Sequence, residues 1–280
     1  MTIRRIAKVF KSRPTVEGAG VHLKRAFGYS QVPQFDPFLM LDDFHTSNPD
    51  EYLAGFPWHP HRGIETITYV LEGLVEHGDS MGNAGVIGAG DVQWMTAGSG
   101  IIHQEMPKGD SQGRMYGLQL WANLPQSQKM MAPRYREVKN ADIPHIVQPD
   151  GVVIRIISGR LNGISGPVRD VVIDPEYLDV EMPADTRLYH PTPPGHTAFI
   201  YLFKGRVRVD DLDLQPGSLA LFEDGDQVHI QAQASSARFL FISGKPLQEP
   251  VAWRGPIVMN TQDELRIAFS EYQNGTFLKS

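Results

Sequence analysis

The sequence of 280 residues contains no cysteine, which excludes disulfide bonds and thiolate metal ligands. This absence is compatible with a reducing compartment, and we expect a cytoplasmic protein. No apolar run approaches the ~18 residues that a membrane-spanning helix needs, so we expect no membrane partner. Residues 1–11 are basic and amphipathic but lack the apolar stretch and the cleavage site of a signal peptide. We expect this segment to form an opening strand.

Positive charge is also sparse, since 26 Lys and Arg stand against 32 Asp and Glu, for a net charge of −6. No basic cluster or helix-turn-helix pattern is present, so we expect no direct contact with nucleic acid. With 41% apolar and 21% charged residues, the composition is that of an ordinary globular protein. A chain of this length exceeds what one hydrophobic core usually supports, which favours two domains.

Short strands dominate the pattern. Residues 64–73 are rich in β-branched and aromatic side chains and end at a glycine, as a strand does. Three more segments, 90–96, 101–106 and 116–121, have the same character. The 27 Gly and 21 Pro are scattered between such segments as turn residues, which indicates an all-β protein.

The second half repeats this pattern of strands and turn residues in weaker form. The segment that ends at Gly205 matches the one that ends at Gly73, and residues 216–222 match 89–95. The two halves therefore resemble duplicated β-barrels. The polar stretch 126–136 is the best candidate for a linker. We predict one domain over residues 1–133 and a second over 134–280.

One helix is predicted near the C-terminus. Thr261 and Glu264 form a capping box, and apolar residues recur on one face until Gly275 ends the pattern. We expect this helix to pack on the outside of a barrel in a structural role.

Two short pairs of possible metal ligands stand out. His59 and His61 are separated by one residue, and so are His103 and Glu105. Side chains at positions i and i+2 of a strand point to the same face. If the two strands are neighbours in a barrel, three imidazoles and one carboxylate converge on one point. The sequence therefore predicts a site for a divalent metal ion.

Around these pairs the chain resembles the pirin family of bicupins. The resemblance rests on Phe56-Pro-Trp-His-Pro-His-Arg-Gly-Ile-Glu-Thr and on Gly90-Asp-Val-Gln-Trp-Met-Thr-Ala-Gly-Ser-Gly-Ile-Ile-His-Gln-Glu-Met-Pro107. It continues in Gly117-Leu-Gln-Leu-Trp-Ala-Asn-Leu-Pro125 and in the segment after Gly255, and it covers essentially the whole chain. It implies two tandem cupin (jelly-roll) β-barrels with a C-terminal α-helix.

The resemblance implies that the iron ligands are His59, His61, His103 and Glu105. Cupins often take their carboxylate from a position a few residues after the His-x-His pair, which here is Glu65. The pirin pattern favours Glu105. Arg62 flanks the ligands but points to the opposite face by strand parity, so we assign it no catalytic role.

The second half departs from the ligand pattern. In the repeat alignment, Pro191 and Pro193 take the places of His59 and His61, and His229 and Gln231 take those of His103 and Glu105, with His196 displaced nearby. Since proline offers no ligand atom, we expect the C-terminal barrel to be free of metal.

Three imidazoles and one carboxylate suit iron(II), the ion that we favour, and also nickel, copper, manganese or zinc. The resemblance implies a quercetin 2,3-dioxygenase, which opens a flavonol ring with dioxygen and releases carbon monoxide. Glu105 would be the general base. The candidate substrate pocket consists of apolar side chains near the ligands: Phe56, Trp94, Met95, Ile101 and Trp121. The alternative is an iron-containing, redox-sensitive regulator that binds transcription factors or other proteins, as animal pirins do.

Overall fold

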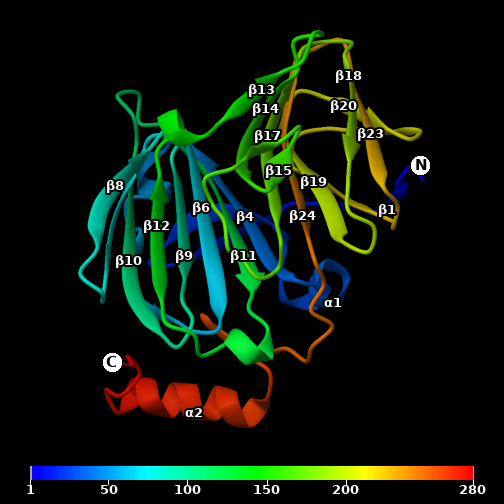
Figure 1. Cartoon of the computed structure of the whole chain (residues 1–280). Helices are drawn as coiled ribbons and strands as arrows, with labels where there is room; N and C mark the ends of the chain where they lie inside the picture. The colour runs from blue at the N-terminus through cyan, green and yellow to red at the C-terminus, as the bar shows by residue number, and fades with distance from the viewer. Residues whose placement is uncertain (1, 280) are drawn as a thin grey trace. The chain divides into compact units, whose positions relative to one another are not determined.

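The computed structural model describes residues 2–279, which are mostly β-strands (Figure 1). The chain divides into two compact units. We call the unit formed by residues 14–140 and the tail from residue 247 onward the first barrel. The second barrel consists of residues 141–246 and the segment that ends at Arg13. Among the described residues, no helix has both the length and the apolar character needed to span a membrane.

The first barrel is built from a seven-stranded and a four-stranded antiparallel sheet. The larger sheet contains, in spatial order, β12 (Arg134–Val138), β9 (Val92–Thr96), β6 (Ile64–Glu72), β11 (Met115–Asn123), β4 (Phe38–Thr46), β3 (Val21–Phe27) and β2 (Arg13–Glu17). The smaller sheet contains β5 (Phe56–His61), β10 (Ile101–Lys108), β7 (Leu74–Asp79) and β8 (Ala84–Gly88). The four strands predicted between residues 64 and 121 are confirmed as β6, β9, β10 and β11.

Short helical turns lie between these strands. They are η1 (Tyr29–Gln31), α1 (Val32–Phe35), η2 (Pro49–Glu51), η3 (Gln126–Gln128) and η4 (Asn140–Asp142).

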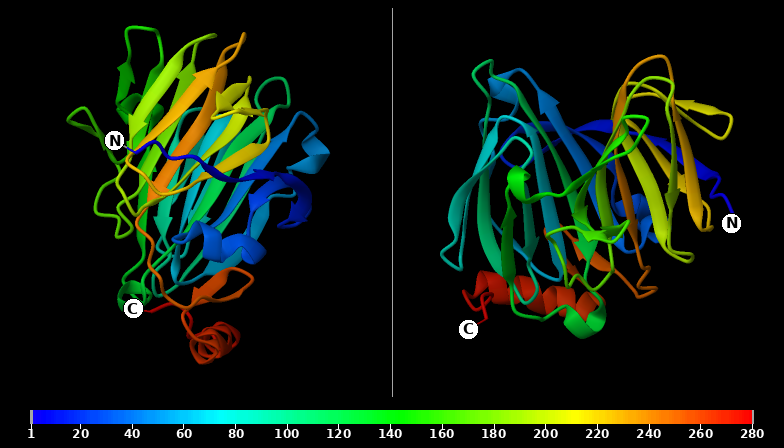
Figure 2. Two further views of the ribbon diagram at one scale, coloured as in Figure 1. Left: turned by 90° about the vertical axis from the view of Figure 1, so that its right-hand side faces the viewer. Right: turned by 45° about the horizontal axis from the view of Figure 1, so that its top comes forward.

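The C-terminal tail completes the first barrel. It forms the hairpin of β25 (Ala252–Arg254) and β26 (Ile257–Met259), followed by α2 (Gln262–Gln273). Thr261 and Glu264 make the predicted capping box, and α2 lies across one end of the barrel (Figures 1 and 2). The tail is held by an apolar cluster made of Ala252, Ile257, Met259, Leu265, Ala268 and Phe277, against which Ile102 of β10 packs. The predicted helix is confirmed.

The second barrel repeats the spatial order of the strands in the two main sheets of the first. Its larger sheet contains β1 (Ile6–Lys11), β22 (Ser218–Phe222), β19 (Thr197–Lys204), β24 (Ala237–Gly244), β17 (Glu176–Met182), β14 (Val153–Ser158) and β13 (His145–Val147). Its smaller sheets contain β18 (Arg187–Pro191), β23 (Gln227–Ala232), β20 (Val207–Val209) and β21 (Leu212–Leu214), and the hairpin β15 (Arg160–Leu161) and β16 (Ile164–Ser165). The predicted duplication is therefore confirmed.

The domain bounds predicted from the sequence, 1–133 and 134–280, differ from this division at both ends. β1 pairs with β22 in the second barrel, where it takes the sheet position that β12 has in the first. The predicted linker, 126–136, is wrong over its last part, because β12 begins at Arg134 and pairs with β9. The tail belongs to the first barrel because its apolar side chains are buried there.

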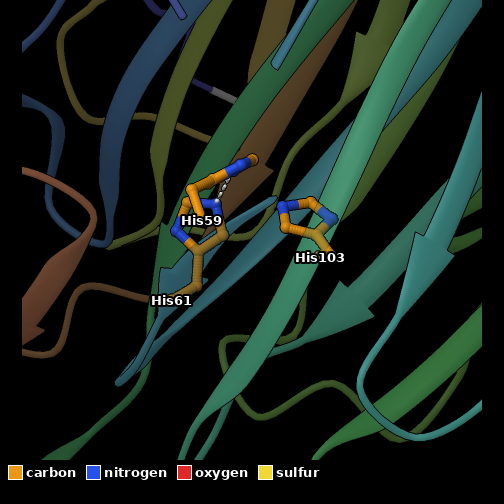
Figure 3. Close-up of side chains that lie close together, drawn as sticks. All are labelled: His59, His61 and His103. Atoms are coloured by element: carbon orange, nitrogen blue, oxygen red, sulfur yellow. Dashed lines mark hydrogen bonds between the residues drawn. The ribbon is translucent and has the colours of Figure 1, made fainter. Parts of the chain in front are cut away.

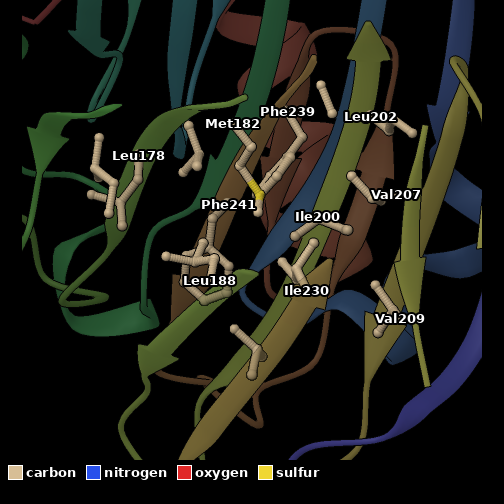
Figure 4. Close-up of a cluster of buried hydrophobic side chains, with 14 of the residues drawn as sticks. Leu178, Met182, Leu188, Ile200, Leu202, Val207, Val209, Ile230, Phe239 and Phe241 are labelled. Carbon is tan, nitrogen blue, oxygen red and sulfur yellow. The ribbon is translucent and has the colours of Figure 1, made fainter. Parts of the chain in front are cut away.

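The interior of the second barrel is apolar. Aliphatic and aromatic side chains from its two main sheets point toward one another and fill the space between them, among them Leu188, Ile200, Ile230, Phe239 and Phe241 (Figure 4). Polar side chains are buried beside this core as well: His190 is 2% exposed, and its Nε2 lies 3.2 Å from Glu176 Oε1.

Strand register corrects the repeat alignment in the second barrel. Tyr189 lies opposite His229, as His59 lies opposite His103 in the first barrel. Pro191 then corresponds to His61, and Pro193 lies beyond the strand. The predicted pairing was displaced by two residues, because it followed spacing in the sequence and not hydrogen-bond register.

Candidate metal centre

Three imidazoles meet inside the first barrel. His59 and His61 project from β5, and His103 projects from the neighbouring β10, directly opposite His59 (Figure 3). One ring nitrogen from each histidine lies within 4.8 Å of the other two. In residues 2–279, no other His, Cys, Asp or Glu side chains form such a group of three or more. β5 is an edge strand and therefore tolerates its two prolines, Pro57 and Pro60, without losing interior ladder bonds.

Backbone carbonyls orient two of the rings. His59 Nδ1 donates to the carbonyl oxygen of Pro57 at 2.9 Å, and His61 Nδ1 donates to that of Pro256 at 3.1 Å. A carbonyl only accepts, so both Nδ1 atoms carry the proton and each Nε2 of a neutral ring presents a lone pair. The two Nε2 atoms lie 3.0 Å apart. Two acceptors at this distance need a shared proton or a cation between them.

The electrostatics keep the buried rings neutral. Burial lowers the pKa of His61 well below its usual value, the charge of His59 lowers it further, and the Pro256 carbonyl opposes both effects. Burial also lowers the pKa of His103 well below its usual value, with His61, His59 and His77 contributing in the same direction. A metal ligand must be the neutral imidazole, so these shifts favour metal binding over protonation.

The third ring supplies a further test of whether a cation fits. His103 is 2% exposed, and its Nε2 is a buried polar atom with no hydrogen-bond partner. A buried, unsatisfied nitrogen costs about 1–3 kcal/mol, unless a ligand satisfies it. The facing lone pairs of His59 and His61 and the orphaned nitrogen of His103 therefore fit a divalent ion.

Glu105 lies beside this group and does not belong to it. Its carboxylate accepts a hydrogen bond from Thr68 Oγ1 at 2.9 Å and one from Gln119 Nε2 at 3.0 Å. Thr68 and Gln119 are cross-strand partners on β6 and β11, so two neighbouring strands of the larger sheet hold the carboxylate in place. Glu105 lines the same cavity as His59 and His61. It is thus placed to act on a molecule bound next to the histidines.

A cavity of about 590 Å³ opens beside the histidines. Of the five predicted pocket residues, Phe56 and Trp121 line it. Trp94, Met95 and Ile101 do not, which corrects that part of the prediction. Met95 and Ile101 are packed in an apolar cluster, and the indole of Trp94 donates to Glu65. Proximity to the ligands in the sequence could not distinguish side chains that line the cavity from those that are packed elsewhere in the barrel.

Glu65 faces away from the cavity. It pairs with Ala122 of β11, whereas Thr68, three positions later, bonds to Glu105, so the two side chains of β6 point to opposite faces. Thr96 Oγ1 and Trp94 Nε1 donate to its carboxylate at 2.5 Å and 3.1 Å. Burial raises the pKa of Glu65, and these hydrogen bonds oppose the shift. His61 and Glu65 are four residues apart, so in one continuous strand they would share a face. This parity is lost at the Gly63 turn, where φ is +77°.

Arg62 holds the tail in place. It is 1% exposed, and its guanidinium donates to Ser99 O, Glu271 Oε2 and Phe277 O, each at 2.7 Å. The same group lies 4.2 Å from the centre of the Phe277 ring. Of two consecutive residues, His61 therefore points toward the cavity as a candidate ligand, and Arg62 points toward α2 and holds the tail.

Several cavity residues were missed by sequence reasoning. Trp253 and Pro256 come from the tail, and Glu17, Arg25, Met40 and Asp42 come from β2, β3 and β4. These residues are far from the ligand pairs along the chain. The one available signal in the sequence was Trp253, a large aromatic residue in the tail, which could have indicated that the tail contributes to a binding site.

Lys129 supports the corner between β5 and β6. It is 2% exposed, and its ammonium group donates to Gly63 O at 2.8 Å and also to Asn123 Oδ1. Burial lowers its pKa to about 7, while the charges of Glu249 and Glu264 oppose the shift.

This pKa gives a prediction for stability. In the unfolded chain the amine stays protonated up to about pH 10, so the unfolded state binds more protons than the folded state above pH ~7. The Lys129 contribution to the free energy of unfolding is therefore least favourable below pH ~7 and improves as the pH rises. Relative to Lys129→Met, the wild type should gain about 2 kcal/mol between about pH 7 and pH 9. Urea unfolding at both pH values measures this, with exposed Lys108→Met as the control. A pH-independent difference would contradict it.

A small β-barrel with three inward histidines, an adjacent carboxylate and an open cavity defines a cupin-type protein. Here the first barrel has these features, and the second repeats the order of its strands. The family model named Pirin matches residues 20–122, and the model of the Pirin C-terminal cupin domain matches residues 177–278. The chain belongs to the pirin family.

Individual relatives agree with this assignment. The pirin-like protein of Caulobacter vibrioides is 45% identical, over 99% of this chain and 100% of the relative. A Pseudomonas aeruginosa protein with the provisional name quercetin 2,3-dioxygenase is 40% identical, over 97% of both chains. The crystal structure of quercetin 2,3-dioxygenase from Acinetobacter baumannii superimposes with a TM-score of 0.89 at 30% identity, over 99% of both chains.

Proposed function

We propose that this protein is a metal-dependent dioxygenase that converts a flavonol and dioxygen to a ring-opened ester and carbon monoxide. The observation that carries the proposal is the convergence of three imidazole nitrogens, from two buried histidines and one half-buried histidine, at the edge of a cavity that also holds a carboxylate. A cavity of about 590 Å³ is in the range of small-molecule sites. The names of the Pseudomonas and Acinetobacter relatives support the same reaction.

The proposed ion is held by His59, His61 and His103, with Glu105 as a fourth ligand or as a base within reach of it. Iron(II) suits nitrogen and oxygen donors and supplies redox chemistry toward dioxygen, together with acidification of a coordinated hydroxyl. Zinc fits the same donors but offers no redox chemistry. Nickel, copper and manganese remain alternatives for the same site.

The side chains of this chain divide the remaining work. Glu105 accepts the proton of the flavonol hydroxyl next to the ring carbonyl, with Thr68 and Gln119 holding its carboxylate in place. Trp121 stands edge-on to His61 at 5.0 Å and extends to Trp253 at 5.9 Å, which gives a flat ligand an aromatic wall. The flavonol supplies the electrons that reduce dioxygen, so the reaction needs no other reductant.

A Glu105→Gln variant tests the assignment of the base. The amide has the same size but takes up no proton, so kcat should fall about 10²–10⁴-fold. Loss of flavonol absorbance and evolution of carbon monoxide measure turnover, and metal analysis of the same sample shows whether the ion is retained. Glu76→Gln, on an exposed carboxylate of β7, is the matched control. An unchanged kcat would remove Glu105 from the mechanism.

The same assay addresses the regulatory alternative. Absence of turnover in protein fully loaded with iron, nickel, copper or manganese would overturn the dioxygenase proposal. Redox-dependent binding of a protein partner would then become the function to test.

A further inference from the structure

A row of four polar side chains runs across the larger sheet of the first barrel, and three of them, Arg25, Asp42 and Gln119, line the cavity. Strand register pairs Thr68 with Gln119, Gln119 with Asp42, and Asp42 with Arg25, so four adjacent strands contribute one residue each. Opposite residues of antiparallel strands point to the same face. Neighbouring strands are roughly 4.8 Å apart, so Arg25 lies about 10 Å across the sheet from Gln119, the partner of Glu105.

The far end of this row is a three-charge group. Arg25 donates to both carboxylate oxygens of Asp42, at 2.8 Å and 2.7 Å, and its third nitrogen lies 2.9 Å from Glu17 Oε1. All three residues line the cavity. One guanidinium between two carboxylates leaves a net charge of −1, and each of its three nitrogens contacts a carboxylate oxygen.

The carboxylates of Asp42 and Glu17 differ in their exposure. The side chain of Asp42 is 5% exposed, whereas that of Glu17 is 41% exposed. A carboxylate offers about four acceptor positions, so Glu17 keeps acceptor capacity beyond its bond to Arg25. Burial raises the pKa of Asp42 to about 6, against the hydrogen bond and charge of Arg25, so this carboxylate is mostly ionised at pH 7.

Glu17 is also held in a fixed position. The turn that follows it is bonded to the start of β5, since Ala19 N donates to Gly55 O at 3.0 Å. Gly18 has φ +57°, and a Cβ there would lie 2.6 Å from Gly55 O and from the ring of Phe56. The backbone of Glu17 is thus fixed to the part of the cavity wall formed by Phe56 and β5. A preorganised acceptor of this kind favours selective binding of one ligand geometry.

We propose that Glu17, positioned by Arg25 and Asp42, accepts hydrogen bonds from hydroxyl groups on the pendant ring of the substrate, at the end far from the metal. The inference rests on the proposed function and narrows its substrate class. The preferred ligands are neutral polyphenols with a hydroxylated pendant ring. Ligands with a carboxylate at that end are rejected, because the group already carries an excess negative charge.

Binding to zinc-loaded protein tests this without turnover, because zinc does not support the redox step. The probes are flavonols with none, one or two hydroxyls on the pendant ring, and one with a carboxylate there. In the wild type, two hydroxyls should tighten Kd about tenfold relative to none, since hydrogen bonds to charged groups are strong. The carboxylate should bind at least about tenfold more weakly than the monohydroxylated ligand.

Glu17→Gln removes the charge and should reduce both ratios to within about threefold. Glu76→Gln should leave both unchanged. The inference is overturned if wild-type affinity is independent of pendant-ring hydroxyls, or if Glu17→Gln keeps the full ratios. Hydroxyl-dependent binding without turnover by the iron form would count against the proposed function alone. Turnover without hydroxyl dependence would count against this inference alone.

Discussion

A His61→Ala variant is expected to purify without bound metal and to leave flavonol absorbance unchanged. Its affinity for the ion should fall by more than about a hundredfold. Loss of a group that only orients a metal ligand lowers affinity by up to about a hundredfold, and His61 is itself a proposed ligand. Turnover should fall to background. Metal analysis of protein purified without chelator, and titration of the apo protein with iron(II), measure the effect.

The physical reason lies in the arrangement of the ring. His61 is 3% exposed, and its Nδ1 bond to Pro256 O turns Nε2 toward the other two histidines. Alanine removes one of three converging nitrogens and leaves the Pro256 carbonyl without its donor. The remaining two imidazoles lie on different strands, so they cannot hold the ion with comparable geometry.

Two variants separate this effect from misfolding. His59→Ala removes a half-buried ligand and should cause a comparable loss of metal with a smaller loss of stability. His22→Ala removes an exposed histidine of β3 and should change neither property. Iron bound to His61→Ala at wild-type affinity would contradict the assignment of the site, and the dioxygenase proposal would fail with it.

The sequence predicted four strands of the first barrel and the shared face of His59 and His61 because both depend on local regularities. The position of His103 opposite His59 depends on the pairing of β5 with β10. The i and i+2 spacing of His59 and His61 fixes a shared face whatever the rest of the chain does. The capping box at Thr261 is equally local, and α2 begins where it indicates. The repeat of Gly73 at Gly205 identified the duplicated topology, since each glycine ends a corresponding strand.

What the sequence did not predict depends on contacts between distant segments. Trp253 and Pro256 enter the cavity because the tail packs on the first barrel, about 190 residues away from His61 along the chain. The three-charge group of Glu17, Arg25 and Asp42 depends on strand register. Trp94 was placed in the pocket from its position near the ligands, yet it points to the face of the larger sheet that carries Thr96 of β9 and Glu65 of β6.

An Arg62→Met variant is expected to release the tail from the first barrel. Arg62 is the buried partner of its ion pair, and its loss should cost about 3–5 kcal/mol, because two buried carbonyl oxygens are also left without a donor. Here Ser99 O and Phe277 O would lose their donor, and Glu271 would keep only its contact with Lys279. Hydrogen bonds from Lys279 and Arg62 lower the pKa of Glu271, so this carboxylate remains charged near neutral pH.

The loss should be local before it is global. Amide hydrogen exchange across α2 should accelerate most, while β6 and β11 stay protected. Metal affinity should fall about tenfold as well, because Pro256 lies on the released tail and orients His61. Exchange measured by mass spectrometry on peptides from 257–279, with urea unfolding of the same protein, gives both quantities.

The matched control is Arg266→Met, an arginine of the same helix that is 76% exposed and paired with Asp263. Its effect should stay within about 0.5 kcal/mol, as is usual for surface substitutions. If Arg62→Met is as mild as Arg266→Met, the tail is held by its apolar cluster alone. In that case residue 62 does not couple the tail to the metal centre, and the orientation of His61 must come from the hairpin of β25 and β26.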